Sequence, residues 1–282
     1  MLTDNTPVEV HQNINLRIHV KREDLCCPIP GPSFSKMRGV AAHIANRPEA
    51  TIGVLDTYHS KAGWAVSWAC SQLGKKAVDF WPEYKADRED PDFVMRPQQL
   101  RAVGLGAKMV ALPAGRSAIL YHRAKKQLAA EYPGAYLMPN ALKLPESITE
   151  NAAEARRTAA AGALPGKGAL VLSVSSGTVA AGVLKGLSEA GILDYYRVFL
   201  HMGYSRSIPT MREYMTRVSG LDLHSPRYNF VDEGYGYADG AKAQVPFPCN
   251  PYYDAKAWAW LSKPDQQRRF AGMPVTFWNI GD

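Results

Sequence analysis

Residues 170–182 read LVLSVSSGTVAAG, and this stretch decides the fold class. Its largely apolar first half has the length of a buried strand, and a helical pattern follows that runs to about Ala190. A strand that leads directly into a helix is the repeating unit of a parallel sheet with helices on its faces. The stretch therefore predicts an α/β protein.

The turn inside this stretch consists of small residues with hydroxyl groups. Small side chains let an anion approach the backbone, and the first N–H groups of the following helix have no partner within the helix. The turn predicts a phosphate-binding loop, although an ordinary strand-to-helix turn explains it equally well on local grounds. Its residues are Ser175, Ser176, Gly177 and Thr178.

The rest of the chain repeats the alternation of strand and helix. Short apolar or alternating runs predict strands, and longer amphipathic or Ala-rich runs predict helices. Pro82 is expected to end one of the strands, because proline cannot donate to a sheet. The predicted strands are 16–20, 52–55, 77–81, 108–112, 197–202 and 274–278, and the predicted helices are 35–45, 63–73, 96–103, 117–132 and 146–161.

Composition limits the classes of protein that fit. The chain has 282 residues, 46% of them hydrophobic, and a net charge of +7 that favours anionic partners, nucleic acid included. The basic residues are dispersed, so a solvated basic surface is the favoured interpretation. No apolar run is long enough to span a bilayer, and we expect neither a secretory signal nor a metal site. The four cysteines fit a reducing cytoplasm.

Two further segments carry candidate site residues. Lys36 stands at the start of a predicted helix, where partial burial would lower its pKa and favour the neutral amine that attacks an aldehyde. An exposed lysine is the commoner interpretation of such a position. The polar segment 56–63 follows a buried strand, at the end where parallel sheets bind ligands. Helix capping by Asp56 or Thr57 is the alternative.

The order of these motifs resembles a known family. VKREDL at residues 20–25, followed by SFSKMRG at 33–39, is similar to the fold-type II enzymes that depend on pyridoxal 5′-phosphate (PLP). This is the tryptophan synthase β-subunit family, and D-cysteine desulfhydrase and aminocyclopropane-carboxylate deaminase are nearest. The resemblance implies that Lys36 is the Schiff-base lysine. It also implies two open parallel-sheet domains with helices on both faces, a large PLP-binding domain of residues 1–40 plus 150–282 and a small domain of residues 41–149.

The resemblance assigns roles to other positions. Ser60 matches a serine that acts on the substrate, and Lys61 stands where the family has an asparagine that contacts the PLP ring oxygen. The loop 175–178 matches the phosphate loop of the family. Tyr253 matches a tyrosine near the substrate. Ile280 occupies the position of the Ser or Thr that faces the pyridine nitrogen, and Asn279 is expected to substitute for it.

Three functions follow as expectations. The resemblance implies a homodimeric lyase or deaminase that acts on an amino acid through an external aldimine, and the cysteines lead us to expect it in the cytoplasm. The departures at Lys61 and Ile280 favour a second hypothesis, a PLP-dependent decarboxylase or β-replacement enzyme. Its substrate would be an amino group carried on a larger anionic molecule, and nucleic acid is one candidate for that molecule. The third is an inactive relative that binds PLP or an amino acid.

Overall fold

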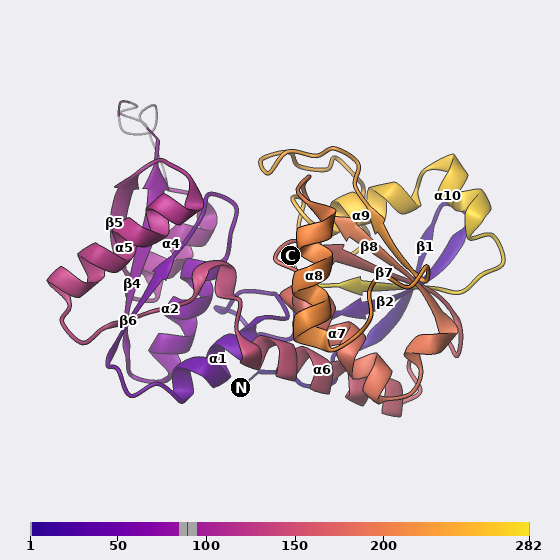
Figure 1. Ribbon diagram of the computed structural model, residues 1–282, viewed down its shortest axis with the longest axis horizontal. Coiled ribbons are helices and arrows are strands. Elements are labelled where there is room, and N and C mark those ends of the chain that lie inside the picture. The colour runs from indigo at the N-terminus through magenta and orange to yellow at the C-terminus, as the bar shows by residue number, and fades with distance from the viewer. Residues whose placement is uncertain (1, 85–88, 90–94, 282) are drawn as a thin grey trace. The chain divides into compact units, whose positions relative to one another are not determined.

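The computed structural model describes residues 2–84, 89 and 95–281 (Figure 1). The chain divides into two compact units, and the division falls inside helix α1 (Met37–Ala45). Both units are built on sheets with parallel strands and on helices, so the α/β fold class is confirmed. Unit 1 comprises Met1–Pro28, Ser33–Gly39 and Pro145–Asp282, and unit 2 comprises Ile29–Pro32 and Val40–Leu144.

Unit 1 contains a six-stranded sheet in the order β1-β2-β10-β7-β8-β9. All neighbouring strands are parallel except β1 and β2, which pair antiparallel at one edge. Strand β7 is buried along its whole length, as expected for a central parallel strand covered on both faces. The strands are β1 (Val8–Asn13), β2 (Leu16–Arg22), β7 (Gly168–Val174), β8 (Tyr196–Met202), β9 (Tyr228–Val231) and β10 (Val275–Asn279).

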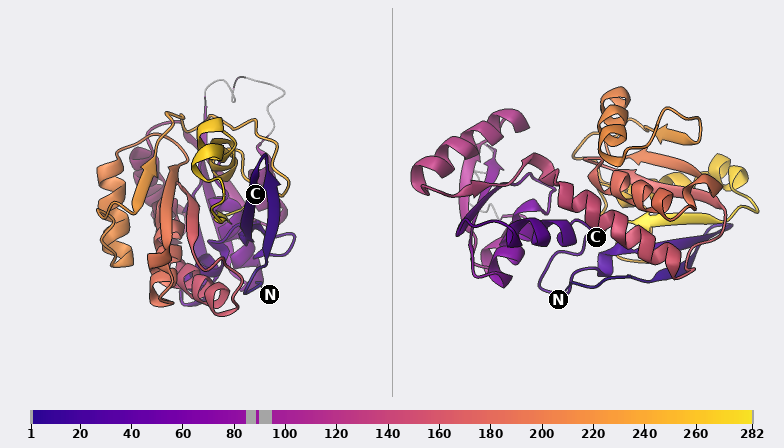
Figure 2. Two further views of the ribbon diagram at one scale, coloured as in Figure 1. Left: turned by 90° about the vertical axis from the view of Figure 1, so that its right-hand side faces the viewer. Right: turned by 60° about the horizontal axis from the view of Figure 1, so that its bottom comes forward.

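Helices cover both faces of this sheet (Figure 2). Leu170 and Leu172 of β7 pack into the core beneath α6, α7 and α8, whereas Ala169 and Val171 pack into the core that contains α9 and Phe270, the residue after α10. Helices α6 and α7 approach closely because Gly186 has no side chain: a Cβ there would lie 2.2 Å from the Ala152 carbonyl oxygen. The helices are α6 (Pro145–Ala160), α7 (Thr178–Glu189), α8 (Ile208–Ser219), α9 (Asp254–Leu261) and α10 (Pro264–Arg269), with short 3₁₀ turns at Glu23–Leu25 and Leu193–Tyr195.

Unit 2 contains a four-stranded, all-parallel sheet in the order β5-β4-β3-β6. Val78 and Phe80 of β4 pack against α5, and the intervening Asp79 points to the opposite face, beneath α2. The elements are β3 (Thr51–Leu55), β4 (Lys76–Glu83), β5 (Lys108–Pro113), β6 (Tyr136–Leu137), α2 (Ala62–Gln72), α4 (Pro97–Gly104), α5 (Ser117–Glu131) and a 3₁₀ turn at Asn140–Leu142.

One expectation about β4 is wrong. The strand does not stop before Pro82 but continues to Glu83. Strand β3 pairs with β4 only as far as Phe80, and beyond that residue β4 pairs with β5 alone. Pro82 therefore stands where, among the described residues, one side of the strand has no paired neighbour that requires its missing N–H.

Over 2–84, 89 and 95–281, none of the helices combines the length and the apolar character that crossing a bilayer requires.

Candidate active site

The predicted phosphate loop connects β7 to α7. Gly177 caps α7 with a left-handed backbone (φ +83°), and a Cβ at this position would lie 2.6 Å from the Met211 sulfur. Glycine is therefore required by both conformation and space. Ser176 donates to the Thr178 hydroxyl (3.2 Å), which hydrogen-bonds with the Tyr214 hydroxyl (3.0 Å). The loop is thus held in place at the N-terminus of α7, where backbone N–H groups favour an anion.

Lys36 lies next to this loop although 140 residues separate them in the sequence. Its segment is attached to the end of the last strand, because the Ser35 N–H donates to the Ile280 carbonyl (2.9 Å). Phe34 also forms a β-bridge with Gly281. The Lys36 Nζ donates to the Ser176 hydroxyl at 2.9 Å. The structure thus brings the predicted amine and the predicted phosphate loop together.

Tyr253 joins the same cluster from the start of α9. Its ring lies against Gly203, where a Cβ would be 2.9 Å from the Tyr253 ring. Burial raises the pKa of the Tyr253 phenol, and the neighbouring Tyr237 raises it further. Tyr253 hydrogen-bonds with both Tyr237 and Ser175. A neutral phenol therefore stands at the first residue of the phosphate loop.

Asn279 and Ile280 have different surroundings. The Asn279 amide nitrogen donates to Asp24 (2.8 Å) and to the Pro248 carbonyl (2.9 Å). Its buried Oδ1 has no hydrogen-bond partner in the described part of the chain. Ile280 packs instead against the core that contains α7. The substitution of Asn279 for the family's Ser or Thr stays a prediction.

Sequence reasoning missed one buried acid close to these residues. Asp254, the first residue of α9, is 2% exposed. Burial raises the pKa of its carboxyl to about 8, Asp24 adds to the rise, and hydrogen bonds from the Ile280 and Gly281 backbone oppose it. An aspartate at the start of a helix usually indicates a cap, so nothing in the sequence indicated a protonated acid.

Ser60 and Lys61 belong to unit 2, at the start of α2. The Ser60 hydroxyl accepts the Ala62 N–H (3.0 Å), and the Lys61 Nζ lies 5.5 Å from the centre of the Trp64 ring. Asp56 accepts the Thr57 N–H (2.8 Å) and anchors the turn. The capping interpretation of this segment and a ligand-binding role are both compatible with these contacts.

The residues of unit 1 fit the cofactor that the resemblance implies. PLP needs an amine for its aldehyde and a site for its phosphate, and Lys36 lies beside a glycine-dependent turn at a helix N-terminus. The Asn279 Oδ1 adds a buried acceptor without a partner in the described residues. Among these same residues, no group of three or more His, Cys, Asp or Glu side chains is arranged to hold a metal.

Comparison with known proteins identifies the family. The chain is 62% identical over 283 residues to the glycyl-dTMP PLP-dependent decarboxylase of Pseudomonas phage M6, and the match covers 100% of both chains. A solved ACC deaminase homologue shares the fold with a TM-score of 0.81 at 17% identity, covering 99% of this chain and 90% of that one. Diaminopropionate ammonia lyase of Escherichia coli gives 0.67 at 16% identity, covering 99% and 83%. No protein-family profile matches the chain.

These likenesses confirm the resemblance drawn from the motifs and the cofactor that it implies. The fold of the solved structures agrees with both sheets of this chain, and the phage relative matches it from end to end. The chain belongs to the fold-type II family of PLP-dependent enzymes.

Proposed function

We propose that this enzyme is a decarboxylase that removes the carboxylate of an amino acid group attached to a thymidine nucleotide. The observation that carries the proposal is the 62% identity, over the whole of both chains, to a protein named a glycyl-dTMP decarboxylase. This is the second of the three functions expected from the sequence. Deamination and elimination are supported only by likeness of fold, and one fold serves many reactions.

The chemistry restricts how the glycyl group is attached to the nucleotide. Reaction with PLP requires a free primary amine, and loss of CO₂ requires a free carboxylate on the same carbon. The nucleotide must then be joined through a remaining valence of that α-carbon. The carbon–carboxylate bond breaks, CO₂ leaves, and one proton is added at the α-carbon to give the primary amine.

The residues of unit 1 supply the protein's part of this reaction. Backbone N–H groups at the start of α7 and the hydroxyls of the 175–178 loop hold the cofactor phosphate. When bound, PLP withdraws the electrons that remain on the α-carbon after CO₂ departs. We assign to Lys36 both the attachment of the cofactor and the delivery of the proton to the α-carbon.

Tyr253 is assigned a different part. Because its pKa is raised by burial, the phenol keeps its proton at neutral pH and cannot serve as a base. It orients groups near Ser175 through hydrogen bonds. The roles that the resemblance gives to Ser60, Lys61 and Asn279 stay predictions, as do the homodimer and the cytoplasmic location.

The test is a product analysis with a labelled substrate. The PLP-loaded enzyme is incubated with glycyl-dTMP that is joined through its α-carbon and carries radiocarbon in its carboxylate. We expect labelled CO₂ and one equivalent of primary amine, with no ammonia or keto acid. Release of ammonia or a keto acid without CO₂ would show that the reaction is an elimination and not a decarboxylation. If no product forms, the third hypothesis, an inactive relative that binds PLP or an amino acid, would be favoured.

A pair of lysine variants connects the reaction to the site. Lys36→Ala should lower CO₂ release by at least about 100-fold, the contribution expected of a positioned acid or base. Lys185→Ala is the matched control, because this lysine lies on α7 with its side chain 40% exposed. Equal activity of the two variants would remove Lys36 from the mechanism.

A further inference from the structure

The loop that follows β8 contains an arginine with buried, unused donors. The Nε and Nη2 atoms of Arg206 are shielded from solvent, and neither has a hydrogen-bond partner among the residues that the structure describes. In the same residues no carboxylate forms an ion pair with the guanidinium. Burial of an unpaired cation is costly, so this position favours an anion that is not part of the chain.

Aromatic contacts connect Arg206 to the phosphate loop. The guanidinium carbon lies 4.7 Å from the centre of the Tyr204 ring, and the Tyr204 and Tyr237 rings meet edge to face at 5.2 Å. Tyr237 hydrogen-bonds with Tyr253, which hydrogen-bonds with Ser175. We call Tyr204, Arg206, Tyr237 and Tyr253 the Arg206 cluster. It lies entirely in unit 1 and ends at the phosphate loop.

The loop that carries Arg206 is anchored on both sides. The Ser205 N–H donates to the Tyr235 carbonyl (2.8 Å), and the Ser205 hydroxyl donates to Asp232. The buried Lys256 ammonium donates to the Gly203 carbonyl, which commits that cation to the backbone. The loop that carries Arg206 follows β8, and the loop that carries Asp232 and Tyr235 follows the parallel strand β9. Both loops therefore lie at the carboxyl ends of parallel strands, the edge at which such sheets bind ligands. Arg206 is thus held in position before any ligand arrives.

We propose that Arg206 binds the phosphate of the nucleotide part of the substrate, with Tyr204 holding the guanidinium in position. This inference rests on the proposed function, since the nucleotide comes from it. A guanidinium suits phosphate because its planar fork donates two parallel hydrogen bonds. The cluster meets the phosphate loop at Ser175, and Lys36 contacts the same loop at Ser176, so the phosphate contact and the reacting amine belong to one site.

The test compares two probes on the PLP-loaded enzyme by calorimetry. We expect dTMP to bind more tightly than thymidine. Arg206→Gln should weaken dTMP binding by about 10- to 100-fold, the value of a charge-assisted hydrogen bond, and leave thymidine binding unchanged. Arg206→Lys should recover part of the loss, because it keeps the charge without the fork. Arg197→Gln is the matched control, an exposed arginine near the beginning of β8.

Three results would overturn the inference. The first is equal affinity of the wild type for dTMP and thymidine, which needs no variant and is unaffected by folding defects. The second is unchanged dTMP affinity in Arg206→Gln. The third is a fall in PLP affinity in Arg206→Gln, measured by spectroscopic titration, which would assign the guanidinium to the cofactor phosphate.

Two further measurements separate neighbouring questions. An oligothymidylate that binds more tightly than dTMP, again through Arg206, would place the phosphate in a DNA strand instead of a free nucleotide, and would still support the inference. CO₂ release from glycyl-dTMP by the wild type tests the proposed function separately. If the wild type releases CO₂ but dTMP binding does not depend on Arg206, only the inference is wrong. If dTMP binds through Arg206 but no CO₂ is released, only the proposed function is wrong.

Discussion

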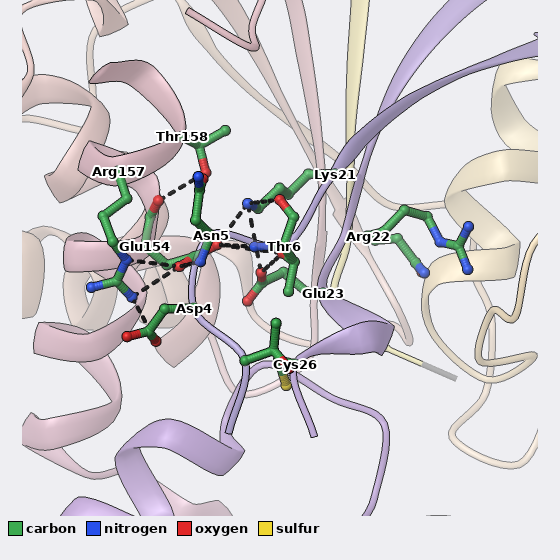
Figure 3. A network of polar contacts seen from close by, with 12 residues as sticks. Asp4, Asn5, Thr6, Lys21, Arg22, Glu23, Cys26, Glu154, Arg157 and Thr158 are labelled. Atoms are coloured by element: carbon green, nitrogen blue, oxygen red, sulfur yellow. Dashed lines mark hydrogen bonds and ion pairs between the residues drawn. The ribbon is translucent and has the colours of Figure 1, made fainter. Parts of the chain in front are cut away.

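Two groups of buried carboxyls, one in each unit, differ in whether a cation accompanies them. In unit 1, Glu23 and Glu154 have fully buried side chains and form ion pairs with Lys21 and Arg38. Figure 3 shows Lys21 beside the two carboxyls. The Lys21 Nζ lies 2.6 Å from Glu154, and Arg38 lies 2.6 Å from Glu23. We call these four residues the ion network. In unit 2, Asp56 and Asp79 are equally buried, and no basic side chain within the described residues forms an ion pair with them.

The pKa values move in opposite directions. Burial alone would raise the pKa of Glu154, but the charges of Lys21 and Arg38 and the hydrogen bonds to it lower that pKa to about 2. Burial raises the pKa of Asp56 to about 7 despite hydrogen bonds from the following turn. Burial and the nearby Asp56 raise that of Asp79 well above its usual value. Equal burial therefore gives a permanent charge in one unit and a retained proton in the other.

The difference has a functional side. Arg38 follows Lys36 by two residues, and its bond to Glu23 fixes the start of α1 to the end of β2. The ion network therefore holds the segment that carries the cofactor lysine. Asp56 instead accepts the Thr57 N–H in the turn that carries Ser60. Protonation of the Asp56–Asp79 pair thus affects the turn in unit 2, whereas Glu154 in unit 1 keeps its charge near neutral pH.

Breaking the ion network should have the largest effect. Lys21→Met removes the cation between Glu23 and Glu154 and leaves buried negative charge. We expect a loss of about 3–5 kcal/mol in the free energy of unfolding, as found when one partner of a buried pair is removed. Urea unfolding at pH 7.5 measures it.

A double variant separates charge from packing. Glu154→Gln keeps an acceptor for the Thr6 N–H but removes the charge that Lys21 balances. Lys21→Met combined with Glu154→Gln should therefore be more stable than Lys21→Met alone. If the double variant loses as much free energy of unfolding as the two single variants together, the loss comes from packing, and the electrostatic explanation of the network is wrong.

The second prediction concerns the pair in unit 2. Because the folded state keeps protons that the unfolded chain releases, its stabilising effect is complete below about pH 4 and declines as the pH rises to about 7. One retained proton gives a slope of about 1.4 kcal/mol per pH unit. Asp79→Asn removes one titrating group of the pair. Between pH 5 and pH 7, we expect the free energy of unfolding of the variant to fall by about 1–3 kcal/mol less than that of the wild type.

Unfolding in urea at pH 5, 6 and 7 checks this, and only the difference between the two proteins matters, because the acids outside the Asp56–Asp79 pair titrate equally in both. Glu131→Gln is the matched control, an exposed acid on α5 of the same unit. Identical pH slopes of Asp79→Asn and the wild type would show that Asp79 is ionised in the folded protein.

Asp254 provides an intermediate case: backbone N–H groups donate to it, and no cation in the described part of the chain pairs with it. Its pKa of about 8 means that the carboxyl is protonated at pH 6, where an amide of the same shape is a close substitute. We expect Asp254→Asn to change the free energy of unfolding by less than about 1 kcal/mol at pH 6. Thermal unfolding of the PLP-loaded enzyme at pH 6 measures it. A loss above about 2 kcal/mol would indicate an ionised Asp254.

The same contrast shows what the sequence could predict. The β7–turn–α7 unit was predictable because an apolar run, a left-handed glycine and a helical pattern are all local. Lys36 was selected as the cofactor lysine by its order relative to other motifs, and that role stays a prediction. The ion network was not predictable, since charged residues are usually exposed and Lys21 and Glu154 are 133 residues apart. The Asn279–Asp24 bond and the buried donors of Arg206 likewise depend on contacts between distant segments.

The smallest effect is expected from an ion pair that lies outside the core. Arg156 follows Glu154 by two residues on α6 and pairs with Glu189 of α7, but their side chains are 45% and 38% exposed. Water already solvates both groups, so Arg156→Ala leaves no buried charge behind and should cost less than about 1 kcal/mol. Urea unfolding in low and in 0.5 M salt, about the condition that screens surface charges, measures it. A loss as large as that of Lys21→Met would mean that burial is not what separates these pairs. A small loss that vanishes in salt would show that neighbouring positions on one helix differ in stability according to whether water can replace the lost partner.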